Sequence, residues 1–585
     1  MAALPTQASP DPLEATYEVL DKAAFAAIGQ ATGGFSPATA VQAMMDWGLH
    51  LALSPGKQIQ LLAKAARKSM RLADYAVRSL GDTEAKPAIE PLPQDRRFTD
   101  PAWKQRPFDL LAQGFLLQQQ WWHAATTGIT GVTRHHEIMM EFAARQSLDM
   151  LAPTNFLISN PVLQARIAET GGRCLVDGFK FWIEDALRLA RGEPAAGCEA
   201  FRPGKEVAAA KGKVVFRNRL IELIQYEPTT EAVRPEPVLI VPAWIMKYYI
   251  LDLSPHNSLV EWLTSQGFTV FMISWHNPDE SDRDLDMEAY RELGPLAALD
   301  AIVTITGAHN VHAAGYCLGG TLLAIAAAAM VREGDDRLAS VTLFAAQTEF
   351  SEPGELGLFI DEAQLNLLDS IMWTQGYLDG RQMGGAFQLL RSNDLIWSRL
   401  LTEYLMGERG PPSDLMAWNA DATRMPYAMH SEYLHKLFLN NDLAEGRYVA
   451  GGRPVSLSAL TAPMFVVGTE QDHVAPWRSV HKIHWLTDAE VSFLLTSGGH
   501  NAGIVSEPGH PGRSYHIECR PQDEPALSPD EWLERAEVRQ GSWWPAWTDW
   551  LASHSSDPTS PPPCGAPDRN YPVLGDAPGL YVLER

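Results

Sequence analysis

Short apolar runs rich in β-branched residues alternate with helical patterns in the part of the chain after residue 205. The runs cover residues 237–242, 268–275, 311–317, 340–346, 464–468 and 491–496. This order of strand and helix predicts an α/β domain over residues 206–585, built on a mostly parallel sheet with helices on both faces. The alternation is interrupted over about 349–460. We expect a cap domain inserted there, over the carboxyl ends of the strands, where such sheets bind ligands.

The chain before residue 206 has helical periodicity instead. Residues 36–80 carry apolar positions at helical spacing, which predicts one or two amphipathic helices. Residues 81–95 are rich in proline and acidic side chains, so we expect a linker that ends at a boundary near Asp95. Residues 96–205 are rich in helix formers and aromatic residues. The pattern therefore predicts an N-terminal extension over 1–95 and a helical domain over 96–205.

Composition narrows the class of protein. With 46% apolar and 20% charged residues the chain is typical of a globular enzyme, and its net charge of -24 argues against nucleic-acid binding. The longest apolar stretch, residues 321–331, is shorter than the roughly 20 residues of a transmembrane helix. The first residues lack the features of a secretory signal, and the five cysteines are scattered without metal-binding spacing. We expect free thiols, no metal and a cytoplasmic location.

One motif combines a reactive side chain with a distinctive local structure. Gly315-Tyr316-Cys317-Leu318-Gly319-Gly320 directly follows a predicted strand and directly precedes a predicted helix. Small residues on both sides of Cys317 allow a sharp strand-to-helix turn that presents a nucleophile above the helix N-terminus. There, the helix dipole and backbone N–H groups favour a thiolate. The alternative is a structural cysteine beside two glycines that pack a helix on a strand.

Two further residues follow later strands in the order expected of an α/β hydrolase. Asp472 follows one predicted strand and His500 follows the last. The order nucleophile, acid, histidine predicts a Cys317, Asp472, His500 triad in an α/β-hydrolase fold. His473 is a rival base, although neighbouring loop residues rarely face each other. His510 and His516 are interpreted as surface residues.

A cysteine nucleophile with a histidine base suits thioester substrates, because a thiolate exchanges one thioester for another at little thermodynamic cost. The chemistry indicated is acyl transfer. An oxyanion formed in such a reaction needs backbone donors. We expect them to be the N–H of Leu318 and an N–H in the loop after the strand at 237–242, assigned to Ile245.

From about Asp95 to the C-terminus the chain resembles the class I polyhydroxyalkanoate synthases, the poly(3-hydroxybutyrate) polymerases. The resemblance is carried by the segments DRRFTDPAW, NFLISNP, VPAWIMKYYILDL, SWHNPD, GYCLGG, NDLIW, AWNADATRMP, GTEQDHVAPW, GGHNAG, GSWWPAWTDWL and APGLYV. It implies an α/β-hydrolase fold with an inserted cap domain, preceded by a helical N-terminal domain. It also implies (R)-3-hydroxyacyl-CoA as substrate, a growing polyester chain as product, a homodimer and a cytoplasmic location at polyester granules.

Carried over by motif, the resemblance implies that Cys317 accepts the acyl group, His500 is the general base and Asp472 orients His500 or helps to activate the incoming hydroxyl. No metal or redox cofactor is implied, since coenzyme A is a leaving group. Four residues at family motif positions are expected to have structural roles: Asp252, Trp418, Asn419 and Asp421.

The sequence departs from the family pattern at four positions beside the predicted site. Ala243 replaces a proline, Met246 an asparagine, Glu470 an arginine and Asn501 an isoleucine. Two alternatives to a synthase therefore stay open. One is a thioesterase or polyester hydrolase with the same triad. The other is a weakly active partner of another synthase, held at granules by the apolar helices before Leu80.

Overall fold

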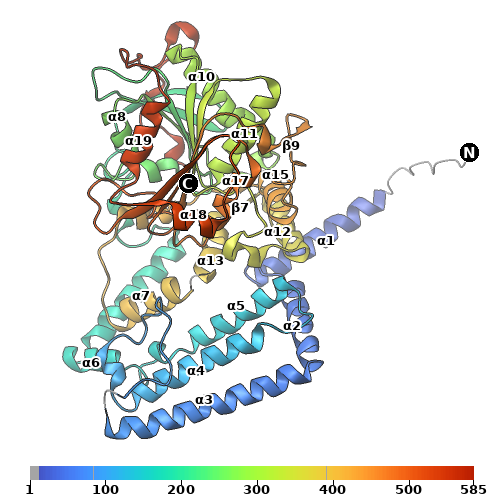
Figure 1. The fold of residues 1–585 in the computed structure, drawn as a ribbon, viewed down its shortest axis with the longest axis vertical. Helices are drawn as coiled ribbons and strands as arrows, with labels where there is room; N and C mark the ends of the chain where they lie inside the picture. Colours follow the sequence, from blue (N-terminus) through green and yellow to red (C-terminus); the bar gives the residue numbers. More distant parts are fainter. Residues whose placement is uncertain (1–11, 83–84, 391) are drawn as a thin grey trace, which may run out of the picture. The chain divides into compact units, whose positions relative to one another are not determined.

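The computed structural model describes residues 12–82, 85–390 and 392–585. It divides into two compact units (Figure 1). The first unit contains the described residues up to Phe35 together with Gly197–Met383 and Ser413–Arg585. The second contains Ser36–Ala196 and Gly384–Pro412. The chain thus leaves the first unit twice and returns to it.

An 11-stranded sheet forms the centre of the first unit, in the order β14-β13-β12-β11-β6-β5-β3-β4-β2-β1-β15. The six predicted strands are all present, and they form its parallel middle. Their bounds are β3 Val238–Val241, β4 Val270–Trp275, β5 Val311–Tyr316, β6 Leu338–Phe344, β11 Met464–Thr469 and β12 Val491–Thr496. Parallel pairing of consecutive strand and helix units confirms the predicted α/β class.

Helices cover both faces of this parallel region. In Figure 1, α8 (Leu259–Ser265) and α19 (Trp544–Ser553) lie on one side of the sheet, and α10 (Ala297–Thr306) and α11 (Leu318–Glu333) on the other. Every residue of β3, β4, β5, β11 and β12 is therefore buried. Burial on both faces explains why the sequences of these strands are continuous apolar runs, from which the strands could be predicted. The apolar stretch at 321–331 belongs to α11, which is buried from Leu318 to Met330.

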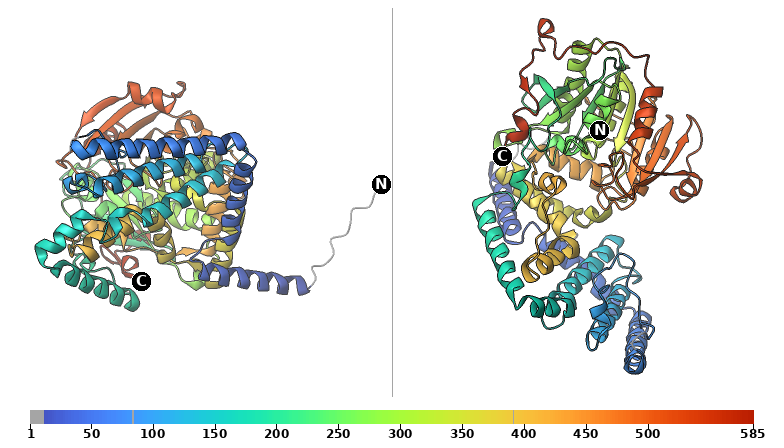
Figure 2. Two further views of the ribbon diagram at one scale, coloured as in Figure 1. Left: turned by 90° about the horizontal axis from the view of Figure 1, so that it is seen from below. Right: turned by 90° about the vertical axis from the view of Figure 1, so that its left-hand side faces the viewer.

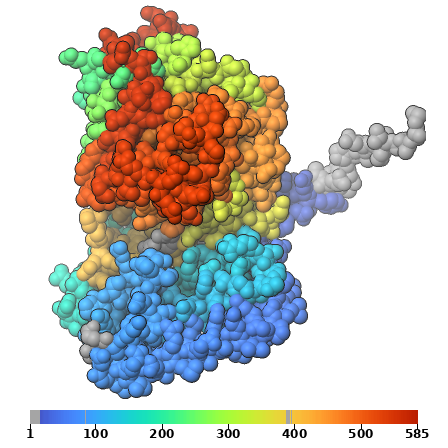
Figure 3. All heavy atoms as spheres, in the orientation of Figure 1, coloured from blue at the N-terminus to red at the C-terminus, as the bar shows by residue number. Residues whose placement is uncertain are grey.

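Antiparallel strands extend the sheet at both edges. They are β1 Gly212–Arg217, β2 Ile221–Tyr226, β13 Ser514–Arg520, β14 Glu537–Gln540 and β15 Gly575–Asp576. Their polar residues weaken the strand pattern in the sequence. In β2, Glu222 and Gln225 are buried because they bind the C-terminal segment: Gln225 bonds to Pro563 and Gly565, and Glu222 accepts the N–H groups of Leu580 and Tyr581. The C-terminal strands and helices, orange to red in Figure 3, form much of the visible face of this unit.

The insertion predicted at 349–460 is present, but it does not form one body. It contains α12 Glu362–Gln375, β7 Tyr377–Leu378, α13 Gly380–Leu390, η8 Asn393–Trp397, η9 Leu400–Leu405, α14 Asp414–Asn419, β8 Met425–Pro426, α15 Tyr427–Glu432 and η10 Tyr433–Leu439. Residues 384–412 belong to the second unit, where η9 packs on α7 (Arg173–Arg191), and the rest belongs to the first. Helix α1 (Pro12–Ala31) packs on α12, so it is part of the first unit.

The second unit is helical, as predicted. Its other helices are α2 Pro37–Ala52, α3 Pro55–Gly81, α4 Phe108–Thr126, α5 Arg134–Met150 and α6 Pro161–Thr170, and α3 runs beside α4 (Figure 2). The compact unit extends from Ser36 to Ala196 without a break at Asp95, and the boundary expected there stays a prediction. The described part of the proline-rich segment packs instead: Ala88 is buried, and the Gln113 side chain bonds to both backbone groups of Ile89 at 2.8 and 3.1 Å.

None of the described helices combines the length and the hydrophobicity that a membrane crossing requires. The five cysteines all lie in described residues and are free.

Candidate active site

Cys317 lies at the turn between β5 and α11. Its φ is 51° and its ψ is -123°, a strained conformation for a residue with a side chain. Two backbone hydrogen bonds hold the turn: the N–H of Cys317 donates to Phe344 O at 2.9 Å, and its carbonyl accepts the N–H of Thr321 at 3.2 Å. The side chain is largely buried. A rigid turn of this kind projects one side chain from the carboxyl edge of the sheet.

Glycines are required on both sides of Cys317 by close backbone contacts. A Cβ on Gly319 would lie 2.1 Å from the carbonyl oxygen of Val241, and one on Gly315 would lie 2.4 Å from the Cα of Gly320. Neither neighbour is a flexible side-chain end that could move away. The glycines therefore allow α11 to approach β3 and β5 closely enough to form the turn.

The other two predicted residues follow β11 and β12, and the structure brings both to Cys317. Nδ1 of His500 lies 2.7 Å from Oδ2 of Asp472, and Cys317 is close enough to the imidazole to raise the pKa of His500. Asp472 is held by three more donors, the hydroxyl of Thr469 at 2.9 Å and the N–H groups of Val474 and Ala475 at 2.8 Å each. The structure thus brings the three side chains together in the order Cys317, His500, Asp472.

The electrostatics of this arrangement favour a charged histidine. Burial alone would raise the pKa of Asp472, but the charge of His500 and the hydrogen bonds that Asp472 accepts lower it. Burial alone would lower the pKa of His500, but the charges of Asp472 and Cys317 and its hydrogen bond to Asp472 raise it well above the ordinary value. The arrangement stabilises an imidazolium beside the cysteine, which is the state that activates a thiol as a nucleophile.

The rival histidines occupy other positions. His473 accepts the N–H of Glu355 on its backbone carbonyl, while the Asp472 carboxylate is bound to His500. His510 pairs with Glu507 at 2.8 Å, and His516 lies beside Glu470 at 3.9 Å. His510 and His516 thus lie beside carboxylates other than Asp472, which is bound to His500.

The two backbone donors assigned to an oxyanion lie on elements that meet beside Cys317. Leu318 is the first residue of α11, so its N–H has no acceptor within the helix. Ile245 is in the loop after β3. This loop is tied to the segment after α14, because the N–H of Thr423 donates to Ile245 O at 3.0 Å and its hydroxyl donates to Trp244 O. The role of these two N–H groups stays a prediction.

Three of the four residues expected to have structural roles, Asp252, Trp418 and Asp421, make buried or part-buried contacts near this loop. The indole of Trp418 donates to Lys247 O at 2.7 Å, and the hydroxyl of Tyr249 donates to Asp421 at 2.9 Å. Asp252 accepts from the hydroxyl of Ser258 at 2.9 Å, and burial raises its pKa to about 7. These contacts join the insertion to the loop that carries Ile245.

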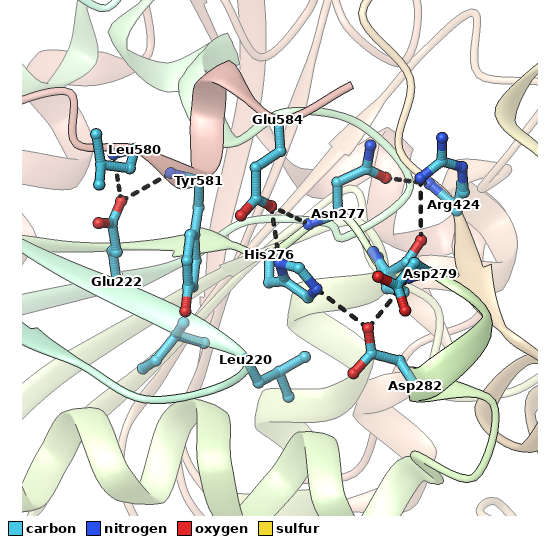
Figure 4. Close-up of polar contacts among 12 residues, drawn as sticks. Leu220, Glu222, His276, Asn277, Asp279, Asp282, Arg424, Leu580, Tyr581 and Glu584 are labelled. Carbon is cyan, nitrogen blue, oxygen red and sulfur yellow. Dashed lines mark hydrogen bonds and ion pairs between the residues drawn. The ribbon is translucent and has the colours of Figure 1, made fainter.

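A further support of this loop was not visible in the sequence. Figure 4 shows the C-terminal segment lying over the ends of β2 and β4. Lys247 donates to Tyr581 O at 2.9 Å, and Glu584 accepts from His276 at 2.7 Å and from the N–H of Asn277 at 2.8 Å. The other nitrogen of His276 lies 3.1 Å from Asp282. The partners His276 and Glu584 are 308 residues apart, so no local pattern could indicate the contact.

The residues that line the main surface hollow of the first unit do not include the predicted catalytic residues. An open hollow of about 740 Å³ is lined by Asp279, Glu280, Ser281, Arg283, Gln375, Tyr377 and Arg424. Among the described residues, no group of three or more His, Cys, Asp or Glu side chains is placed to hold a metal ion.

The sheet order, the turn at Cys317 and the placement of acid and histidine define an α/β-hydrolase fold, and the family model for the alpha/beta hydrolase fold matches residues 236–507. Two other family models match upstream. The model described as poly-beta-hydroxybutyrate polymerase (PhaC) N-terminus matches residues 94–263, and that described as poly-beta-hydroxybutyrate polymerase N terminal matches residues 15–57.

Curated relatives match over most of their length. The chain is 41% identical over 535 residues to a poly(3-hydroxyalkanoate) polymerase of Methylorubrum extorquens, covering 90% of this chain and 87% of the relative. It is 33% identical over 572 residues to the poly(3-hydroxyalkanoate) polymerase subunit PhaC of Cupriavidus necator, covering 94% and 95%. The chain belongs to the poly(3-hydroxyalkanoate) polymerase family, whose members are acyltransferases, as the sequence motifs predicted.

Proposed function

We propose that this enzyme polymerises (R)-3-hydroxyacyl-CoA, with 3-hydroxybutyryl-CoA as the expected substrate, through an acyl-enzyme on Cys317. The observation that carries the proposal is the placement of Cys317, on a strained turn at the carboxyl edge of the sheet, beside a His500 imidazole that is hydrogen-bonded to Asp472. Membership of the polymerase family supplies the substrate class.

The first half of the reaction transfers the acyl group to the enzyme. The Cys317 thiolate attacks the thioester carbonyl, and the N–H groups of Leu318 and Ile245 stabilise the oxyanion. The carbon–sulfur bond to coenzyme A then breaks, and the His500 imidazolium protonates the departing thiolate. The products are an acyl-Cys317 thioester, free coenzyme A and neutral His500.

The second half extends the chain. Neutral His500 takes the proton from the 3-hydroxyl of the next hydroxyacyl unit, whose oxygen attacks the acyl-Cys317 carbonyl. An ester bond forms and the Cys317 thiolate leaves. The carboxylate of Asp472 stabilises the imidazolium in both halves, which is the reason for its buried position against Nδ1.

Burial of the nucleophile favours transfer to a hydroxyl over hydrolysis. Cys317 is 8% exposed, and Tyr433 from the insertion is close enough to Cys317 for the two to interact electrostatically. Limited access of water protects an acyl-enzyme from hydrolysis, which would end chain growth. A thioesterase or polyester hydrolase with the same triad is the second candidate, because the triad can activate either water or a hydroxyl group as the acceptor of the acyl group.

The test is the fate of the acyl group. Purified enzyme is incubated with (R)-3-hydroxybutyryl-CoA, and coenzyme A release and the acyl product are both measured. We expect release with insoluble polyester, abolished in Cys317→Ala and unchanged in Cys519→Ala, which removes an exposed thiol elsewhere on the sheet. Release with free hydroxy acid alone would make the enzyme a hydrolase. Failure of release across a panel of acyl lengths, from folded protein, would contradict catalysis.

We further propose that the enzyme is cytoplasmic, acts at the surface of its own polyester granules and functions as a homodimer. Helix α3 supports granule association, because it carries exposed apolar side chains at helical spacing, Ile59, Leu62, Met70, Val77 and Leu80. Replacing Leu62 and Val77 with Glu should detach a fluorescent fusion from granules in cells. Unchanged polymerase activity in that variant would assign α3 to attachment alone. Detachment of an inactive parent protein would support the granule-bound partner instead.

A further inference from the structure

Tyr316 and Asn501 connect the residue before the nucleophile to the residue after the histidine. The phenol of Tyr316, the last residue of β5, donates to Oδ1 of Asn501 at 2.6 Å. Tyr316 is 1% exposed, and burial raises its pKa well above the ordinary value, so the phenol keeps the proton that it donates. We propose that Tyr316 and Asn501 are positioning residues that hold His500 against Cys317. The inference rests on the proposed function in that Cys317 and His500 are taken as the catalytic pair.

The loop that carries His500 needs a restraint on this side. Two glycines, Gly498 and Gly499, precede the histidine, and Gly498 has a φ of +108°. Glycine backbone rotates more freely than that of other residues, so the position of this loop depends on its contacts. Before His500 these are the N–H of Gln471 on Gly498 O at 2.9 Å and the N–H of Gly503 on Gly499 O at 2.7 Å. The bond from Nδ1 to Asp472 fixes one edge of the ring, so the position of the rest of the ring depends on the backbone of the loop that carries it.

Asn501 restrains the loop directly after His500 through both its backbone and its side chain. Its carbonyl accepts the N–H groups of Ile504 and Val505 at 3.1 and 3.0 Å, which begins a turn directly after His500. Its side-chain oxygen is held by Tyr316, whose ring also lies 5.6 Å from the His500 ring. These contacts fix the position of Asn501 relative to β5, the strand that leads into Cys317.

The same amide reaches the insertion. Nδ2 of Asn501 donates to Oδ1 of Asn419 at the end of α14, at 3.2 Å. This contact is exposed, so we assign it a smaller contribution than the part-buried bond to Tyr316. One side chain therefore joins the nucleophile strand, the histidine loop and the insertion.

The test is a double-mutant cycle on the two partners. Tyr316→Phe removes one hydroxyl and keeps the ring, and Asn501→Leu removes both amide contacts at similar volume. In each single variant we expect kcat for coenzyme A release to fall about tenfold with KM unchanged, because His500 is displaced while substrate contacts remain. The double variant should lose no more activity than either single variant, since both substitutions break the same hydrogen bond.

Alkylation of Cys317 by iodoacetamide provides a readout that needs no substrate, so it separates this inference from the proposed function. It should slow in both single variants at pH 7, because the thiolate depends on the nearby imidazolium. Tyr448→Phe is the matched control: it removes a buried hydroxyl that donates to Glu432 at 2.9 Å, and should leave alkylation unchanged. Alkylation and kcat within twofold of wild type in folded Tyr316→Phe, or additive losses in the double variant, would overturn the proposal.

Discussion

The Nδ1 atom of His500 and the Oδ2 atom of Asp472 lie 2.7 Å apart, although 28 residues separate them in the chain. They meet because β11 and β12 pair in parallel, so the loops after both strands emerge at the same edge of the sheet. The third member of the triad, Cys317, emerges at this edge from β5.

Removing the charge of Asp472 should slow catalysis strongly. In Asp472→Asn the side chain keeps its volume but no longer stabilises the imidazolium, so we expect coenzyme A release to fall by about 10² to 10⁴. Glu507→Gln is the matched control, since it alters a part-buried carboxylate that pairs with His510 at 2.8 Å. A steady-state assay in which both variants retain at least half of the wild-type rate would contradict the role of Asp472.

A side chain at Gly319 should disrupt the nucleophile turn. The added Cβ of Gly319→Ala would lie 2.1 Å from Val241 O, which forces α11 away from β3. We expect a destabilised protein with little activity, measured by thermal unfolding and coenzyme A release. Gly56→Ala in α3 has open space around its Cβ and should be neutral or stabilising by up to about 1 kcal/mol. Equal behaviour of the two variants would show that the close approach is not required.

The contact between His276 and Glu584 should stabilise the enzyme in a pH-dependent way. Hydrogen bonds to Glu584 raise the pKa of His276 above its unfolded value of 6.5. Its contribution is therefore complete below about pH 6.5 and is lost as the pH rises through the raised pKa. Glu584→Gln should lower Tm at pH 6 and make little difference at pH 9.

The control for this experiment is Glu445→Gln, because Glu445 pairs with an arginine that does not titrate in this range. Its effect on Tm should be small and the same at both pH values. A Glu584→Gln effect that is equally large at pH 6 and pH 9 would show that His276 is not the titrating partner.

Two buried histidines should make the enzyme acid-labile. Burial lowers the pKa of His481 to about 4 and that of His484 to about 3. Below about pH 6.5 the unfolded chain binds protons that the folded chain does not, so each histidine removes about 1.4 kcal/mol of stability per pH unit until its folded pKa is reached. Denaturant unfolding at pH 5 and 7.5 should show a smaller loss at pH 5 for His484→Leu than for wild type.

Exposed His309 provides the comparison for that result. His309→Gln should lose as much stability between pH 7.5 and pH 5 as wild type does. If His484→Leu also matches wild type, acid lability arises from other groups.

The amino-acid sequence by itself determined the α/β class, the six parallel strands and the Gly315 to Gly320 turn. These features are local: buried parallel strands are continuously apolar, and a sharp strand-to-helix turn needs small residues beside the nucleophile. The order of Cys317, Asp472 and His500, each after a predicted strand, could also be recognised in the sequence. Loops at the carboxyl ends of parallel strands lie at one edge of the sheet, so the three residues were expected to meet.

Only the tertiary structure decided which distant residues meet. Glu222 in β2 and Glu584 at the end of the chain were uninformative as sequence, yet each binds a backbone or side chain more than 300 residues away. The hydrogen bond from Tyr316 to Asn501 and the membership of residues 384–412 in the second unit likewise depend on contacts between residues far apart in the sequence. A polar side chain does not specify its partner locally, because any donor or acceptor of matching geometry satisfies it, and folding alone selects which one comes within reach.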